Sequence, residues 1–259
     1  MSLNLLLESL AQGGVTRRTA VLVGVTGDGK SSTGNALTGH AAFQVSGGLK
    51  SETRAHAFAD YRQNGAFWRV IDTAGLEDTC LPHLEVLRRF SLFADNAAEG
   101  VDSFVFVVRW GRFKPEHDEA LECFAANVGE GALRRTVLCF THCPLAPDAL
   151  ANVLADEGQA PASLQRWLPR LAAVVGVDHA AAGSDTGARL QGAMQAVVDA
   201  HGGERYSNAA LLDAKARLSR DAEAERAAFA AAVSDWRKTE GPLTVEREPG
   251  VVTRPPQAL

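Results

Sequence analysis

A glycine-rich segment, Gly24–Ser31, constrains the fold of this chain more than any other feature of its sequence. It fits the pattern G-x-x-x-x-G-K-[ST], it directly follows the apolar, β-branched run Thr19–Gly24, and Lys30–Leu37 after it has the pattern of a helix start. In a strand–loop–helix unit of this kind, glycines let the backbone wrap around an anion, so that its N–H groups point inward at a phosphate. The pattern therefore predicts a phosphate-binding loop, with a purely structural glycine turn as the alternative.

The residue types in this loop predict individual roles toward a nucleotide. Lys30 supplies a positive charge to the β- and γ-phosphates and is the expected catalytic cation of the loop, and the Ser31 hydroxyl is expected to ligate Mg²⁺. The predicted nucleotide-binding residues of the loop are Gly24, Thr26, Gly27, Asp28, Gly29, Lys30, Ser31 and Ser32.

A second motif, Val70–Gly75, is an apolar strand that ends in Asp72 and has a glycine three residues further on. We expect Asp72 to hold Mg²⁺ through a water molecule and the Gly75 N–H to bond the γ-phosphate. A loop rich in Ser and Gly lies between the two motifs. A loop that responds to the γ-phosphate needs a Ser or Thr to complete the Mg²⁺ shell, and Thr53 is the expected metal ligand, with Ser51 as the alternative.

Apolar runs and helical patterns alternate from about residue 19 to residue 201. The patterns predict strands at 19–24, 55–62, 66–71, 103–108, 136–140 and 171–177. They predict helices at 30–37, 80–98, 115–129, 147–167 (with a break at Pro161) and 185–200. Asn64-Gly65 favours a hairpin between the second and third strands, since both residues tolerate positive φ. The expected fold is α/β, with a doubly wound, mostly parallel sheet and one antiparallel hairpin strand, in which ligands bind at the carboxyl ends of the strands.

Composition shifts along the chain predict four segments. They are an N-terminal segment at 1–14, the α/β domain at 15–203, a C-terminal amphipathic helix at 204–240 and a disordered tail at 241–259. Apolar residues recur near helical spacing in the third segment, so this helix either packs back on the domain or pairs with another chain. The tail contains four prolines, which is typical of a segment without regular structure.

Overall composition excludes several classes of protein. The chain has 259 residues, a net charge of −5 and 46% hydrophobic residues, which excludes a disordered chain and a nucleic-acid-binding protein with a basic surface. No stretch approaches the ~20 apolar residues that a membrane span requires, although the leucine-rich segment 1–14 leaves a peripheral membrane contact open. The four cysteines are irregularly spaced, which predicts reduced thiols and a cytoplasmic location.

Several motifs resemble those of one protein family. Gly24–Asn35 looks like the extended phosphate loop of the GIMAP/IAN (AIG-type) GTPases, in which Thr-Gly-Asn follows the lysine. Ser51–Thr53 is similar to the S-x-T switch of this family, and Ile71–Thr79 to its I-D-T-P-G-L-x-D-T. Phe104–Glu116 resembles a hydrophobic box that is particular to the family, and Phe140–His142 resembles the F-T-H that opens its base-recognition loop.

The resemblance covers about residues 17–210 and implies a P-loop NTPase G domain, related to septins, that binds GTP or GDP with Mg²⁺. It also implies that His142 contacts the base. Two departures leave the base specificity open. Pro144 stands where the family has a carboxylate that accepts hydrogen bonds from guanine N1–H and N2–H₂, with Asp148 as a nearby substitute, and Val177–His179 stands where the family has F-N-N. A base-tolerant or ATP-binding NTPase is therefore the alternative.

Hydrolysis requires a positioned water molecule and positive charge at the γ-phosphoryl group. Leu76 follows Gly75 and cannot orient water, which predicts slow intrinsic hydrolysis. The resemblance implies that Arg112, just past the strand 103–108, acts as an arginine finger across a homodimer or homo-oligomer formed through the nucleotide face. A structural or surface arginine is the alternative. The expected function is a guanine-nucleotide switch, and a catalytically inactive scaffold is a further alternative that Leu76 and Pro144 favour.

Overall fold

The computed structural model describes residues 17–45, 57–63, 65–73, 94–156, 158–179 and 186–209, and parts of the segment 211–231. Internal contacts divide the chain into two compact units, 1–215 and 216–259. Several predictions fall outside the described residues: the N-terminal segment 1–14, Ser51, Thr53, Gly75, Leu76, most of the helix predicted at 80–98, and the tail 241–259.

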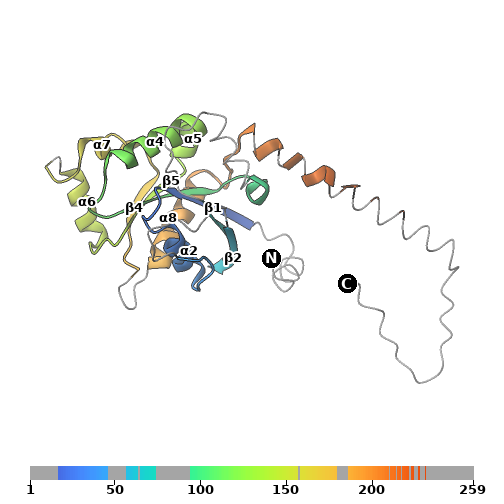
Figure 1. Ribbon diagram of the computed structural model, residues 1–259, viewed down its shortest axis with the longest axis horizontal. Coiled ribbons are helices and arrows are strands. Elements are labelled where there is room, and N and C mark those ends of the chain that lie inside the picture. Colours follow the sequence, from blue (N-terminus) through green and yellow to red (C-terminus); the bar gives the residue numbers. More distant parts are fainter. Residues whose placement is uncertain are drawn as a thin grey trace, which may run out of the picture. The chain divides into compact units, whose positions relative to one another are not determined.

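A six-stranded sheet forms the centre of the first unit (Figure 1). Its strands are β1 (Arg17–Gly24), β2 (Ala57–Gln63), β3 (Ala66–Asp72), β4 (Ser103–Arg109), β5 (Thr136–Thr141) and β6 (Ala173–Gly176). Their order across the sheet is β2-β3-β1-β4-β5-β6, and every neighbouring pair is parallel except the hairpin of β2 and β3. This arrangement confirms the predicted α/β class with a mostly parallel sheet and one antiparallel strand.

Helices cover both faces of this sheet (Figure 1). One face is covered by α2 (Lys30–Thr38) and α8 (Thr186–Ala200), which share a hydrophobic core with the sheet. The other face is covered by α4 (Pro115–Val128), α5 (Glu130–Leu133), α6 (Pro147–Ala155) and α7 (Ala162–Gln165), which share a second core. There are also two short 3₁₀ turns, η1 (Asp95–Ala97) and η2 (Leu168–Arg170).

The side chains of β4 explain why this strand is almost continuously apolar. Phe104, Phe106 and Val108 belong to the core beneath α4, whereas Val105 and Val107 belong to the core beneath α2 and α8. Successive side chains of a strand point to opposite faces, so a strand that is buried on both sides needs apolar residues at every position. The doubly wound arrangement therefore follows from the pattern of this strand.

The helix predicted from 147 to 167 is shorter than expected, because α6 ends at Ala155, before the predicted break at Pro161. The Asp156 carboxylate accepts hydrogen bonds from the Gly158 N–H (2.8 Å) and from the side-chain amide of Gln159 (2.6 Å). Hydrogen bonds of an Asp side chain to the chain that follows it compete with helical hydrogen bonds and favour a turn. The prediction of a helix up to residue 161 was therefore wrong.

The described residues between 209 and 231 are helical. Leu211 is fully buried and belongs to the core of the first unit. The domain boundaries predicted at 203 and 240 stay predictions. In the parts of the chain that the structure describes, no helix has both the length and the apolar character that crossing a membrane would need.

Candidate nucleotide-binding site

Four neighbouring parallel strands bring the predicted motifs to one edge of the sheet. β1 ends at Gly24, where the glycine-rich loop begins, and β3 ends at Asp72. β4 ends three residues before Arg112, and β5 ends at Thr141, next to His142. Parallel strands carry their carboxyl ends to the same edge, which is where open α/β sheets bind ligands. Motifs that are far apart in the sequence therefore meet around the loop after β1.

The glycines of the loop are required by its geometry. Gly24, Gly27 and Gly29 have φ values of 137°, 85° and 99°, which side chains disfavour. A Cβ atom on Gly24 would also lie 2.4 Å from the carbonyl oxygen of Val107 in β4, and one on Gly29 would lie 3.3 Å from the Thr141 side chain. The loop is therefore packed against the ends of both β4 and β5, and no side chain other than hydrogen fits at Gly24.

Lys30 begins helix α2, and its side chain is folded back under the loop. Its Nζ donates hydrogen bonds to the carbonyl oxygens of Gly24 (3.2 Å) and Val25 (3.0 Å), and the residue is buried. The Thr33 N–H donates to the Gly29 carbonyl (2.8 Å), which closes the first helical turn. The cation and the free N–H groups at the start of a helix both favour an anion at this point.

Ser31 and Asp72, the described residues that were predicted to hold Mg²⁺, meet beside this lysine. The Ser31 hydroxyl donates to Asp72 Oδ2 over 2.6 Å. Oδ1 of the same carboxylate is buried and accepts no hydrogen bond from any residue that the structure describes. Burial raises the pKa of Asp72 above its usual value, and the hydrogen bond from Ser31 and the charge of Lys30 oppose this rise.

These oxygens fit the chemistry of Mg²⁺. Mg²⁺ prefers hard oxygen ligands and is usually bound by one or two protein groups together with water and substrate phosphates. An unpartnered buried carboxylate oxygen beside a serine hydroxyl provides such ligands. Across the described ranges no group of three His, Cys, Asp or Glu side chains could enclose a metal by itself, so a cation here would share its ligands with a bound phosphate.

We expect Asp72→Asn to stabilise the nucleotide-free protein and to remove its response to Mg²⁺. Because the pKa of Asp72 is raised in the folded state, the unfolded chain releases this proton first, and stability falls as pH rises above the ordinary carboxyl value of about 4. Asparagine keeps an oxygen for Ser31 but carries no charge. At pH 7 the melting temperature should rise by about 2–4 °C for each kcal/mol recovered.

Scanning calorimetry at several pH values measures this effect, which should shrink as the pH approaches about 4. Asp60→Asn is a matched control that should shift the melting temperature in the opposite direction. Asp60 accepts two hydrogen bonds of 2.8 Å from Arg69, and both side chains are nearly buried. That variant should melt earlier than the wild type. An Asp72→Asn protein that melts no later than wild type at pH 7 would contradict the expectation.

Asp28, a predicted nucleotide-binding residue, has its side chain and its carbonyl oxygen engaged within the protein. Its carboxylate contacts His117 Nε2 (2.7 Å), at the start of α4, and its carbonyl oxygen accepts a hydrogen bond from the Thr141 hydroxyl (2.7 Å). Only the backbone N–H of Asp28 therefore remains for a phosphate. Neither contact was predicted from the sequence, although a threonine that ends a buried strand and a histidine in the first turn of a helix were visible signals.

The predicted base-binding residues lie at the end of β5 beyond the loop. His142 is exposed and has a φ of 52°, and the Cys143 N–H donates to the Val177 carbonyl (3.0 Å), which joins this loop to the end of β6. His179 Nε2 lies 3.1 Å from the Thr33 hydroxyl. Burial, then the nearby His142, lowers the pKa of His179, so its ring is neutral at pH 7.

A cavity of about 330 Å³ lies beside this region. It is lined by Ser32, Asn35, Ala36, Val45, His179, Thr186 and Gly187. Ser32, a predicted nucleotide contact, and His179 therefore share one hollow next to the first turn of α2. Of the other predicted nucleotide contacts in the loop, Thr26 is half-buried and Gly27 is exposed.

Arg112 lies on a tight turn after β4. Gly111 has a φ of 73°, and the Arg112 N–H donates to the Arg109 carbonyl (3.1 Å). The Trp110 N–H donates to the Thr141 carbonyl (2.9 Å), which fixes this turn against β5. The Arg112 residue itself is exposed. The structure thus places its guanidinium on the surface at the edge of the sheet that carries the loop.

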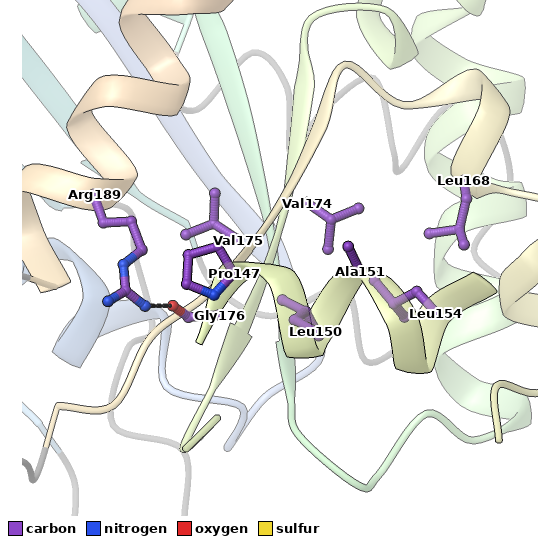
Figure 2. A pocket seen from close by; sticks show the side chains of 9 residues that line it. All are labelled: Pro147, Leu150, Ala151, Leu154, Leu168, Val174, Val175, Gly176 and Arg189. Carbon is purple, nitrogen blue, oxygen red and sulfur yellow. Dashed lines mark hydrogen bonds between the residues drawn. The ribbon is translucent and has the colours of Figure 1, made fainter. Parts of the chain in front are cut away.

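A second, apolar pocket of about 280 Å³ lies between α6 and β6 (Figure 2). The residues that line it are Pro147, Leu150, Ala151, Leu154, Leu168, Val174, Val175, Gly176 and Arg189. The Arg189 guanidinium donates to the Gly176 carbonyl (2.9 Å) rather than pointing into open space. This lining lacks the cation, hydroxyl and carboxylate that meet under the loop, so the loop is the better candidate for a nucleotide site.

The strand–loop–helix unit with Lys30, and the meeting of Ser31 with Asp72, define a P-loop NTPase G domain. A sequence model of the AIG1 family matches residues 18–225. The chain belongs to the AIG1 family, as the motifs of the sequence predicted.

Two relatives in Arabidopsis thaliana illustrate the similarity. Immune-associated nucleotide-binding protein 12 is 34% identical over 134 residues, which is 48% of this chain and 32% of that protein. Immune-associated nucleotide-binding protein 10 is 31% identical over 126 residues, which is 48% of this chain and 27% of that protein. The chain thus spans about a third of the length of these curated relatives.

Solved structures share the fold. The crystal structure of Toc33 from Arabidopsis thaliana with Mg²⁺ and GMPPNP has a TM-score of 0.53 and 20% identity, and the match covers 77% of this chain and 90% of that chain. A dimerisation-deficient arginine-to-alanine variant of Toc33 also has a TM-score of 0.53 and 20% identity, with the same coverage. Both structural similarities support the α/β architecture of this chain.

Proposed function

We propose that this chain is a Mg²⁺-dependent guanine-nucleotide switch that hydrolyses GTP slowly and dimerises through its nucleotide face. The observation that carries the proposal is the meeting of Lys30, Ser31 and Asp72 under the glycine-rich loop. These residues combine a cation for phosphates with two oxygens for a divalent ion. Toc33, a structural relative, was crystallised with GDP and Mg²⁺ and with GMPPNP and Mg²⁺, which supports guanine nucleotides as the ligands.

In this proposal the loop N–H groups and Lys30 bind the β- and γ-phosphates, while Ser31 and Asp72 hold Mg²⁺. Thr53 completes the metal ligands, and the Gly75 N–H responds to the γ-phosphate. When bound, Mg²⁺ offsets the negative charge of the phosphate oxygens. His142 contacts the base.

Base preference depends on the loop after β5, where Pro144 stands in place of the carboxylate that pairs with guanine in the family. Displacement of a fluorescent GDP analogue by unlabelled GTP, GDP and ATP tests it directly. We expect GTP to compete at a concentration at least about tenfold lower than ATP, since one good hydrogen bond to the base contributes about that factor. Equal competition by ATP and GTP would favour the base-tolerant NTPase instead.

Turnover separates the switch from the inactive scaffold. The scaffold is favoured by Leu76, which cannot orient a water molecule. Phosphate release is measured over several turnovers at rising protein concentration. Steady release that exceeds one phosphate per protein molecule supports the switch, and binding of nucleotide without any such release supports the scaffold.

In this proposal, dimerisation supplies the positive charge that hydrolysis requires at the γ-phosphoryl group. Dimerisation is important for the GTPase activity of the chloroplast translocon components atToc33 and psToc159. A dimerisation-deficient Toc33 variant carries an arginine-to-alanine substitution. We propose that Arg112, exposed at the edge of the sheet that carries the loop, acts on the nucleotide of a second copy.

We also propose a cytoplasmic location, without a nucleic-acid partner and with any membrane contact peripheral. The described cysteines Cys123, Cys139 and Cys143 are free thiols, which is typical of a reducing compartment. Burial raises the pKa of Cys139 to about 12. Its thiol is therefore protonated and inert rather than poised for oxidation.

A further inference from the structure

Asp28 presents an electrostatic problem for a loop that binds phosphates. The residue directly precedes Gly29 and Lys30, in the stretch whose N–H groups face the anion. A carboxylate that turned into this stretch would repel a polyphosphate, and charges are weakly screened in a partly buried site. Some feature of the fold must therefore hold this carboxylate away from the loop interior.

His117 provides that feature through a hydrogen bond between its ring and the carboxylate. Its Nε2 lies 2.7 Å from Asp28 Oδ2, and the two side chains are only 5% and 9% exposed. The contact joins residues 89 positions apart, from the phosphate loop to the first turn of α4. Water therefore has little access to this pair, which strengthens the hydrogen bond.

The other ring nitrogen of His117 determines which nitrogen carries the proton. Nδ1 accepts a hydrogen bond from the Lys114 N–H (3.0 Å), so Nδ1 holds a lone pair and the proton is on Nε2. Nε2–H then donates to the Asp28 carboxylate. Phe113 stacks on the ring, with ring centroids 5.8 Å apart and planes at 27°, and so limits its rotation.

The backbone of Asp28 is held from a second direction. The Thr141 hydroxyl donates to the Asp28 carbonyl over 2.7 Å, from the end of β5. Asp28 is therefore fixed through both its side chain and its main chain, by residues of two different elements. Its carboxylate and its carbonyl oxygen are thus both engaged by the protein, and its N–H remains for a phosphate.

We propose that His117 is a positioning residue that keeps the Asp28 carboxylate out of the phosphate site. The inference rests on the proposed nucleotide binding, because it concerns the same loop. His117 touches no phosphate in this proposal and acts only through Asp28. The same ring holds Lys114, two residues after Arg112, so one side chain joins the phosphate loop to the turn that carries the proposed arginine finger.

A cycle of variants at the two positions tests the proposal, with a fluorescent GDP analogue as the probe in the presence of Mg²⁺. His117→Asn keeps an acceptor near Lys114 but is too short to reach Asp28, and it should raise the Kd about tenfold or more. Asp28→Asn removes the charge that the ring is proposed to hold away and keeps an oxygen for Nε2–H, so its Kd is the reference value for the double variant. The double variant should return to within about threefold of Asp28→Asn.

Recovery in the double variant distinguishes positioning from a general loss of structure, because a second substitution would not repair a damaged fold. His40→Asn is the matched control, since His40 is exposed and, among the described residues, the hydrogen bond of its ring goes to the Thr38 carbonyl. It should leave the Kd unchanged. Equal weakening by His117→Asn with and without the Asp28 charge would overturn the proposal.

Ring nitrogen spectra of ¹⁵N-histidine-labelled protein without nucleotide provide a second measurement. One histidine should appear as the neutral Nε2–H form with a slowly exchanging proton, and its signal should vanish in His117→Asn. A His117 signal averaged between both tautomers would also overturn the proposal. A wild-type protein that binds no nucleotide would overturn the proposed function as well, whereas normal binding without recovery in the double variant overturns the His117 proposal alone.

Discussion

Replacing Lys30 with alanine is expected to weaken nucleotide binding by ~10²- to 10³-fold. A hydrogen bond between charged groups contributes about 1.5–3 kcal/mol, and Lys30 is positioned to bond two phosphates. Its Nζ is buried beneath the loop, where it donates to the carbonyls of Gly24 and Val25, so its charge is poorly screened. Titration with a fluorescent GDP analogue measures the change in Kd.

Lys215→Ala is the matched control for this substitution. Lys215 pairs with Glu99 at 3.0 Å, and both side chains are at least half exposed. An exposed pair contributes little to stability, and the control should bind nucleotide as wild type does. A folded Lys30→Ala protein with wild-type affinity would contradict the assignment of the phosphate site.

Arg112→Ala is expected to lower by about 10³-fold the part of GTP hydrolysis that rises with protein concentration. Arginine fingers supplied in trans contribute ~10³–10⁵ to the rate of related reactions. The affinity for nucleotide should be unchanged, because Arg112 is exposed and is proposed to act on a second copy. Single-turnover hydrolysis over a range of protein concentrations measures the effect.

Arg134→Ala is a control at the opposite edge of the sheet. Arg134 is also exposed, but it precedes β5, whereas Arg112 follows β4, and the two strands are parallel. This variant should hydrolyse GTP at the wild-type rate. Two results would rule out action in trans. One is a wild-type rate of GTP hydrolysis per molecule that does not depend on protein concentration. The other is an Arg112→Ala rate equal to the wild-type rate.

The sequence was sufficient for the fold because its strongest signals are local. Continuous apolar runs predicted β1, β4 and β5, and the Asn-Gly dipeptide predicted the turn between β2 and β3. Each signal depends on residues that are neighbours in the chain, and the right-handed connection of parallel strands then leaves few possible sheets. The family model and the sheet both confirm this part of the interpretation.

The contacts that support the loop could not be predicted from local sequence patterns. Thr141 reaches Asp28 across 113 residues, His117 reaches it across 89, and His179 reaches Thr33 across 146. Such pairs depend on the register between strands and on side-chain rotamers, which no local pattern contains. Asp28 is an example. Its place in the motif predicts a nucleotide contact, for which its backbone N–H remains, but the motif does not predict the contact of its carboxylate with His117 in α4.

The position of β1 between β3 and β4 also affects how the chain folds as it is synthesised. Both partners of β1 come later in the sequence, and Thr141, which holds the loop at Asp28, comes later still. Since synthesis proceeds from the N-terminus, the glycine-rich loop leaves the ribosome before the strands beside β1 and Thr141 have been synthesised. A ligand stabilises only the state that binds it. A nascent chain that has not yet added β5 must therefore rely on its own apolar core, without help from nucleotide.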